Sequence, residues 1–207
     1  MTMRKLLILV FLIFGSSLSF VATAQSGYKL QFRVDGWQDT TVYLGHYYGE
    51  STYLKDTAKV NSSGQFVFDG KKDLAQGVYF LVLNKTKIFE FLIGKNQFFS
   101  LDTKREDYVK NMKVTGDTDN KIFFDNMVFN MERHLEAEPL LKIIQDSTIA
   151  EEKKKKVRED FAKINDKVTE HQQSIIDKNP GTLVGALFKA NMPVKVPEAP
   201  RKPNGSI

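Results

Sequence analysis

The spacing of apolar residues changes once along this chain, near Gly116, and this change constrains the fold more than any other feature. Between about residues 27 and 115 apolar and polar residues alternate, with Leu30, Phe32 and Val34 on the same side of the first run. A repeat of two indicates half-buried β-strands. Beyond Gly116 the apolar residues are spaced by three and four, as in amphipathic helices. The sequence therefore predicts an α+β protein in which the strands come first.

The first region predicts about eight short strands separated by turn residues. The cluster Asn61–Gly64 leads from one apolar run directly into the next, which predicts a β-hairpin with a longer loop. Regular turns between short strands favour an antiparallel β-sandwich-like domain, which we place at residues 25–116. The expected strands lie near 29–35, 41–47, 53–60, 65–68, 77–83, 88–93, 98–101 and 112–114.

Residues 117–192 are predicted to be helical. Asp117-Thr118-Asp119 places acidic side chains at a helix start, where the helix dipole favours them. A second helix is expected to begin near Ser147 or Thr148, and Thr182 is a candidate cap for a short third helix. The second helix carries an apolar stripe, with His171 in the remaining place of the repeat: Val157, Phe161, Ile164, Val168 and Ile175.

That stripe must be covered by another surface, because helices in proteins are stabilised mainly by tertiary packing. We expect the first helix to cover it through Phe123, Met127 and Met131, which gives an antiparallel helical hairpin. The sheet or a second copy of the chain is expected to cover what remains, so a homodimer is one arrangement consistent with the sequence.

The N-terminus has the three parts of a secretory signal peptide. Arg4 and Lys5 precede the apolar run Leu6–Phe14, and Ala22-Thr23-Ala24 forms a small-residue exit. The alternative is an uncleaved membrane anchor, but the apolar run is shorter than the ~20 residues that a span needs. We therefore expect residues 1–24 to be removed. The protein is expected in the periplasm or cell envelope, with no stable membrane insertion after cleavage.

The other end, residues 193–207, contains four prolines and reads as a semi-extended linker. A linker implies that another domain follows it. The chain would then be either a truncated product or a free-standing accessory protein.

Several kinds of chemistry find no support in the residues. The chain has no cysteine, which excludes disulfides, thiolate catalysis and cysteine-bound zinc. His46, His134 and His171 do not have metal-binding spacing, and neither a nucleophile elbow nor a phosphate loop occurs. We predict no catalytic residue, no cofactor and no metal, and hence a protein that is not an enzyme.

Charge argues against a nucleic-acid partner. The leader carries Arg4, Lys5 and no acidic residue, so its removal lowers the formal net charge from +5 to +3. Acidic and basic residues are interspersed, without the basic stripe that nucleic acids require. The run Glu151–Lys156 is the sharpest charge cluster. One interpretation is binding to an anionic lipid or polymer, but a solvated first turn of a helix is the favoured one, since Glu151 and Glu152 offset the lysines.

One aromatic-rich polar cluster is the candidate ligand-contact site. It consists of Trp37, Tyr43, Tyr47, Tyr48 and Tyr53. Exposed aromatic rings on a β scaffold are a common means of binding sugar rings or peptides. The same residues are also ordinary components of strands.

Three stretches resemble a known arrangement. Lys55–Gly70 is similar to a "D-[ST]-A-x-V … G-x-F-x-F-x-G" hairpin, and Val114–Asn120 is similar to a "V-x-G-S-x-x-N" exit into helices. Asn179–Leu183 with Leu187–Ala190 resembles the end of the helical segment. Together they resemble the β-rich domain of unknown function and the helical segment that precede the thioredoxin-like domain in exported TlpA/ResA-type thiol-disulfide oxidoreductases.

The resemblance implies a non-catalytic accessory region, because the C-x-x-C motif of the redox domain is missing and no catalytic residue can be transferred to this chain. Such a region would position or dimerise a thioredoxin-like domain or another redox partner, or present substrate to it. The alternative from another functional class is an independent exported module that binds a glycan or peptide through the aromatic cluster.

Overall fold

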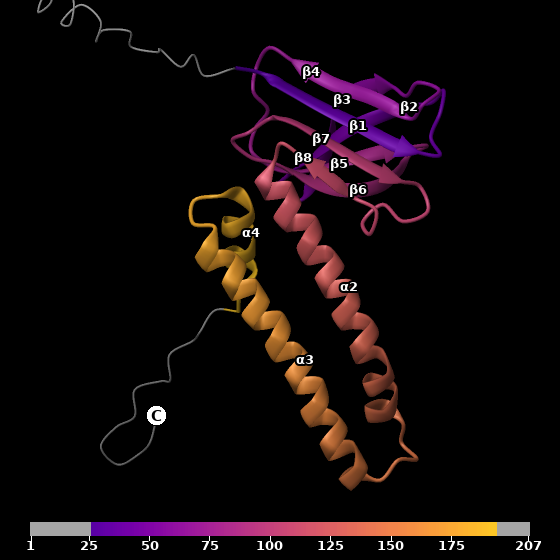
Figure 1. The fold of residues 1–207 in the computed structure, drawn as a ribbon, viewed down its shortest axis with the longest axis vertical. Helices are drawn as coiled ribbons and strands as arrows, with labels where there is room; N and C mark the ends of the chain where they lie inside the picture. Colours follow the sequence, from indigo (N-terminus) through magenta and orange to yellow (C-terminus); the bar gives the residue numbers. More distant parts are fainter. Residues whose placement is uncertain (1–25, 194–207) are drawn as a thin grey trace, which may run out of the picture.

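The computed structural model describes residues 26–193, which form a two-sheet β-sandwich and a helical arm that projects from it (Figure 1). The described residues are therefore α+β with a β-sandwich-like domain, and the predicted fold class is confirmed. The elements are β1 (Tyr28–Asp35), β2 (Thr41–Tyr48), β3 (Ser51–Lys59), β4 (Gln65–Gly70), β5 (Gly77–Leu83), β6 (Thr86–Ile93), β7 (Phe98–Lys104), β8 (Lys113–Thr115), α2 (Thr118–Gln145), α3 (Glu151–Lys178) and α4 (Leu183–Asn191).

The strands form two sheets of four. Sheet A has the order β4-β1-β7-β8 and sheet B has the order β3-β2-β5-β6. All neighbours pair antiparallel except β1 and β7, which run parallel with Lys29 opposite Phe98. The sheets are thus mainly, but not entirely, antiparallel. The parallel pairing of β1 and β7 is possible because the strands β2 to β6 lie between them in the chain, which leaves room for a long crossover connection.

Stacked aromatic rings fill the space between the sheets. Phe32 of β1 stacks on Phe66 of β4 with ring centroids 5.0 Å apart, and it meets the edge of Phe91 from sheet B at 5.3 Å. All three rings are at most 3% exposed. Burial of each such side chain stabilises a fold by about 1.5–3 kcal/mol, so the alternating aromatic residues define which face of each strand points inward.

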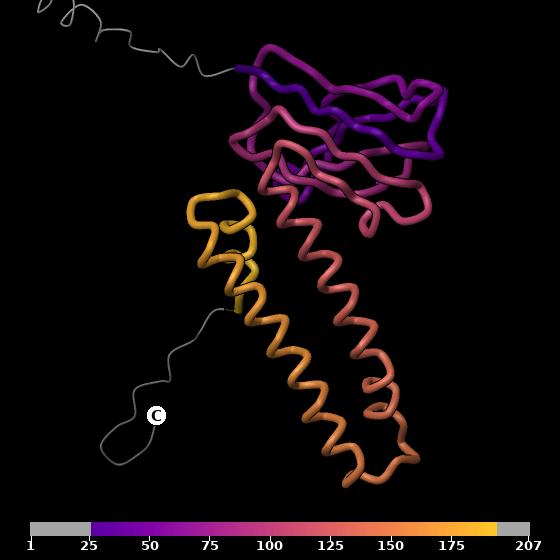
Figure 2. The backbone as a smooth tube through the Cα atoms, in the orientation of Figure 1, coloured from indigo at the N-terminus to yellow at the C-terminus, as the bar shows by residue number. Residues whose placement is uncertain are grey.

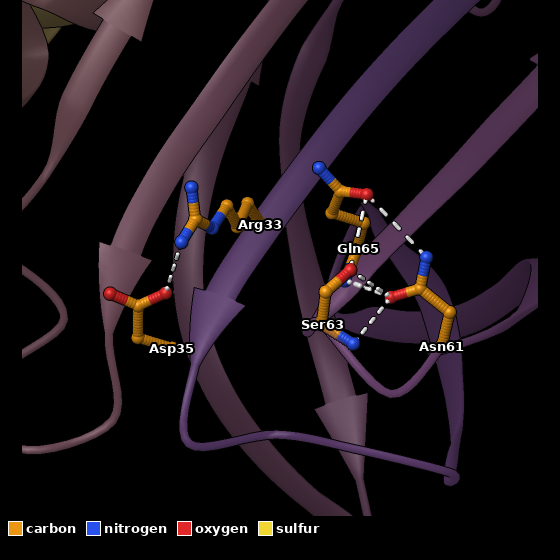
Figure 3. Close-up of polar contacts among 5 residues, drawn as sticks. All are labelled: Arg33, Asp35, Asn61, Ser63 and Gln65. Carbon is orange, nitrogen blue, oxygen red and sulfur yellow. Dashed lines mark hydrogen bonds and ion pairs between the residues drawn. The ribbon is translucent and has the colours of Figure 1, made fainter.

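The expected hairpin around Asn61 does not form. β3 pairs with β2 in sheet B, whereas β4 pairs with β1 in sheet A, so the turn carries the chain from one sheet to the other. The Asn61 side-chain oxygen accepts hydrogen bonds from the backbone N–H groups of Ser63 and Gln65, at 3.0 and 2.9 Å (Figure 3). The turn residues were recognised correctly, but local turn chemistry does not decide which strands pair.

The arm is joined to the sandwich by the first turns of α2. Asp117 caps this helix by accepting a hydrogen bond from the backbone N–H of Asn120, which confirms the predicted helix start. Asn120 is fully buried, and its side chain bonds both the N–H and the C=O of Leu92 in β6, each at 2.7 Å. The backbone groups of the edge strand β6 therefore find their partner in the Asn120 side chain of α2, and this contact fixes where the arm starts.

Further along, α2 packs against both the sandwich and α3, which accounts for its imperfect apolar face. Phe123, Phe124 and Met127 pack against the core of the sandwich. That Phe123, Met127 and Met131 also cover the stripe of α3 stays a prediction. Met131 is 43% exposed, and Phe129 meets α3 by stacking on His171 with ring centroids 3.9 Å apart.

α3 returns antiparallel to α2 and brings α4 back beside the sandwich (Figure 2). It begins at Glu151, a few residues later than expected, because Asp146 and Thr148 bond to each other in a turn. Thr182 caps α4 through the N–H of Gly185, as predicted. Of the predicted stripe, Ile164 and Ile175 are buried, whereas the other members are half-buried.

Polar side chains lie along the seam between α2 and α3. Within residues 26–193, four of their buried atoms have no hydrogen-bond partner: Asn126 Oδ1, Asn130 Oδ1, Arg133 Nε and His171 Nε2. Unsatisfied buried polar atoms are costly, so the hairpin is held together less tightly than an apolar seam of the same length would be.

The expected signal peptide (residues 1–24) lies outside the described residues, as does nearly all of the linker at 193–207. Among the helices that are described, none is both long and apolar enough to span a membrane.

We expect the Asn120→Ala variant to lose about 2–4 kcal/mol of unfolding free energy, since it leaves the N–H and C=O of Leu92 buried without partners. Urea denaturation followed by circular dichroism measures this loss. Asn130→Ala, on the same helix, is the matched control and should cost under about 1 kcal/mol because its Oδ1 has no partner. Equal losses in the two variants would contradict the proposed junction.

His171 should make the stability depend on pH. Burial lowers the pKa of His171, and the charge of Lys178 lowers this pKa further. As the pH falls, the unfolded chain binds the proton first, near its ordinary pKa of ~6.5. The contribution of His171 to the free energy of unfolding is therefore complete above that pH. It is lost as the pH falls towards the lower pKa of His171 in the folded state.

Urea denaturation at pH 7.5 and pH 5.5 measures this dependence. The loss of stability between the two values should be smaller in His171→Phe, which keeps a ring to stack on Phe129, than in the wild type. His134→Phe, at an exposed position of α2, should retain the full loss. An unchanged pH dependence in His171→Phe would show that His171 does not contribute to it.

Candidate ligand-binding platform

The structure separates the predicted aromatic cluster into different parts of the sandwich. Trp37 lies in the core, 4% exposed, with its ring 5.9 Å from that of Phe66. Tyr43 and Tyr47 alternate with the buried Val42 and Leu44 along β2 and so lie on the outer face of sheet B.

Of the two remaining tyrosines, Tyr48 is the last residue of β2 and Tyr53 lies in β3. Tyr48 is 76% exposed and lines neither of the two hollows described below. Tyr53 is 51% exposed, and its ring lies 5.8 Å from that of His46. Tyr53 is paired with His46, which alternates with Tyr47 along β2, so the rings of Tyr53 and Tyr47 point to opposite faces of sheet B. Both residues nevertheless border the first of these hollows, whereas Trp37 does not, and the ligand-contact role of the cluster stays a prediction.

The outer face of sheet B presents an open apolar surface, which we call the ring platform and define as Tyr47, Leu54, Phe80 and Val82. Together with Tyr53 and Lys87, these side chains line a shallow hollow of about 330 Å³. Leu54 is 63% exposed and Tyr47 is 38% exposed. Apolar side chains with this exposure on adjacent strands form a surface that a ligand can cover.

Glycine at position 45 makes room for the ring beneath the platform. The Phe80 ring of β5 lies across Gly45 of β2, and a Cβ at that position would collide with the ring. Tyr47 then packs against Phe80, with ring centroids 5.0 Å apart. The absence of one side chain thus allows the buried Phe80 ring, 5% exposed, to support the exposed Tyr47 ring.

A charged network holds the hydroxyl end of Tyr47. Lys87 Nζ donates to the Tyr47 hydroxyl and to the Glu90 carboxylate, each at 2.6 Å, and the Tyr47 hydroxyl donates to Glu90. Lys87 also lies 5.4 Å from the centre of the Tyr47 ring, within the range of a cation–π contact. The ring is therefore fixed at both ends although it is exposed.

The same contacts change the acid–base properties of the pair. Hydrogen bonding to Glu90 and then to Tyr47 raises the pKa of Lys87 above its ordinary value. Burial acts to raise the pKa of Glu90, but the hydrogen bonds from Lys87 and Tyr47 outweigh it and lower that pKa. Both groups therefore stay charged at neutral pH, and the network persists there.

Sequence reasoning missed Phe80, Lys87 and Glu90 as members of this surface. Alternation within 77–83 places Phe80 and Val82 on one face, but the sequence does not show that β5 lies next to β2. That pairing joins segments more than thirty residues apart, which no local pattern encodes.

Other polar features of the described residues carry no comparable site. Within residues 26–193, no group of three or more His, Asp or Glu side chains could hold a metal ion. The lysine run at the start of α3 is not a single patch, because Lys154 is turned inward and only 7% exposed, with its Nζ 3.5 Å from Glu151. Lys153, Lys155 and Lys156 remain at the surface.

The open face of sheet A is polar, and part of it is paired internally. Arg33 contacts Asp35 at 3.2 Å, and Gln65 joins the Asn61 turn (Figure 3). Both ion-pair partners are about half exposed. This face therefore resembles the solvated side of an ordinary two-layer sandwich.

Comparison with known proteins identifies the β region only. A search of curated proteins found no match to the chain. The match to a known family begins at the first residue of β1 and ends inside α2, so it includes the Asn120 junction and stops before the arm. Residues 28–123 match the model of DUF4369, a domain of unknown function.

Proposed function

We propose that this protein is a non-catalytic binding module whose ring platform takes up a glycan or an extended peptide. The observation that supports this is the fixed, exposed ring of Tyr47, which is packed on Phe80 and hydrogen-bonded to Lys87 and Glu90. A surface ring that is already immobile loses little conformational entropy when a ligand stacks on it. Sugar rings and peptide side chains both present flat apolar surfaces that suit such a platform.

Arrays of neutral oligosaccharides and of extended peptides provide the test, followed by titration of the strongest ligand. Tyr47→Ala should weaken binding about tenfold, since a stacked aromatic ring contributes ~1–1.5 kcal/mol. Tyr48→Ala is the matched control, because Tyr48 is more exposed but does not line the hollow, and it should bind like wild type. Tyr47→Phe separates the ring from the hydroxyl network. Equal affinity in wild type and Tyr47→Ala would refute the proposal.

A second candidate function follows from the arm and the resemblance. The chain would act as the accessory region of a TlpA/ResA-type thiol-disulfide oxidoreductase and position, dimerise or present substrate to its thioredoxin-like domain. The supporting observation is the hydrogen-bonded Asn120 junction, which joins the sandwich rigidly to α2, a helix of 28 residues. At 1.5 Å per residue such a helix spans ~42 Å, enough to hold two domains apart.

Insulin reduction distinguishes this role from catalysis. The chain alone should not accelerate reduction by dithiothreitol, because thiol–disulfide exchange needs a thiolate and the chain has no cysteine. Added to a purified thioredoxin-like domain, it should change the rate or substrate preference of that domain. If the domain behaves identically with and without the chain, the accessory role is wrong.

A further inference from the structure

A second hollow, of about 470 Å³, lies among the loops at one end of the sandwich. We call it the loop-end hollow and define it by Trp37, Gln38, Asn84, Thr86, Arg105 and Tyr108. Its side chains come from the β1–β2 loop, the β5–β6 turn and the β7–β8 loop. Loops held by a rigid sheet scaffold are where binding residues commonly occur.

The backbone around the loop-end hollow is held in disfavoured conformations. Asp39, Asn84 and Lys85 have φ angles of +49°, +50° and +65°, and within residues 26–193 they are the non-glycine residues with positive φ. Asn84 and Lys85 form the two-residue turn between β5 and β6, which demands this conformation. Of these three residues Asn84 lines the loop-end hollow, so the turn fixes the position of its side chain there.

Arg105 supplies the charge of this hollow. Its backbone N–H donates to the Asp35 carbonyl at 3.0 Å, which anchors the residue beside Gly36. Two of the nearby carboxylates are engaged elsewhere, because Asp35 pairs with Arg33 and Asp107 accepts from the N–H of Lys110 at 2.9 Å. Among the described residues, none forms a salt bridge with the Arg105 guanidinium.

Around this cation stand groups that both donate and accept hydrogen bonds. The indole N–H of Trp37 donates to the Tyr108 hydroxyl at 3.3 Å, so the hydroxyl proton of Tyr108 is available to a ligand. The side chains of Gln38, Asn84 and Thr86 form no hydrogen bonds within the described part of the protein. Amide and hydroxyl groups complement sugar hydroxyls, which are likewise donors and acceptors.

We propose that the loop-end hollow binds a carboxylate-bearing sugar. The planar guanidinium of Arg105 pairs with the sugar carboxylate in a two-pronged contact. The Tyr108 hydroxyl, Asn84 and Thr86 bind the ring hydroxyls. A saccharide fits better than an acidic peptide, because the lining of the hollow supplies amide and hydroxyl groups that complement sugar hydroxyls. This site is separate from the ring platform and does not depend on the function proposed for it.

The single tryptophan of the chain provides a direct reporter. Trp37 borders the hollow, so its indole N–H gives one assignable signal in a ¹⁵N-correlated NMR spectrum. D-glucuronate should shift this signal saturably, whereas D-glucose, which lacks the carboxylate, should need at least about tenfold more ligand, as expected for one charged contact. Equal responses to the two sugars, or no saturable shift with either, would overturn the proposal.

Variants identify the residues responsible. Arg105→Gln should reduce the affinity for glucuronate about tenfold, to the level of glucose, because it removes the charged partner of the carboxylate. Arg33→Gln removes an exposed arginine of the same sandwich outside this hollow and should bind glucuronate like wild type. A loss in Arg33→Gln equal to that in Arg105→Gln would indicate a general charge effect and refute the site.

Two further measurements fix the ligand class and the location. N-acetyl-diglutamate should bind more weakly than glucuronate, and tighter binding of this peptide would overturn the assignment to a sugar. Tyr47→Ala should leave glucuronate binding unchanged, so a failure of the ring platform and a failure of the loop-end hollow can be told apart. A thermal melt of Arg105→Gln that matches wild type confirms that its fold is intact.

Discussion

The rest of the structure depends on the side chain of Asn120, which replaces the missing neighbour of β6. An edge strand has unpaired N–H and C=O groups that must find partners when they are buried. Asn120 supplies both a donor and an acceptor to Leu92, while Asp117 caps the helix that carries it. The end of the sandwich and the start of the arm are therefore one unit, and a change in either alters the other.

This junction also explains why α2 and α3 bury polar atoms without hydrogen-bond partners between them. The first turns of α2 are committed to the sandwich through Phe124, which fixes the rotation of the whole helix. Further along, that rotation turns Asn126 and Arg133 towards α3 and leaves Met131 and Leu135 at the surface. A helix that meets two different partners cannot present its best apolar face to both.

The two proposed sites use different parts of the sandwich for different chemistry. The ring platform lies on the outer face of sheet B, where the small Gly45 lets the buried Phe80 ring support Tyr47. The loop-end hollow uses turns whose backbone the sheets hold in place, with Arg105 as its charge. The two proposals together assign an apolar ring surface and a carboxylate to different parts of one domain.

The sequence by itself determined the features that depend on near neighbours: the alternation of Leu30, Phe32 and Val34 and the caps at Asp117 and Thr182. These could be predicted because strand alternation and helix capping involve residues within a few positions of each other. Tertiary structure alone decided that β3 and β4 belong to different sheets, that Phe80 lies beneath Tyr47, and that Trp37 is buried. Those outcomes depend on which distant strands meet, and that choice rests on the packing of the whole core rather than on any local pattern.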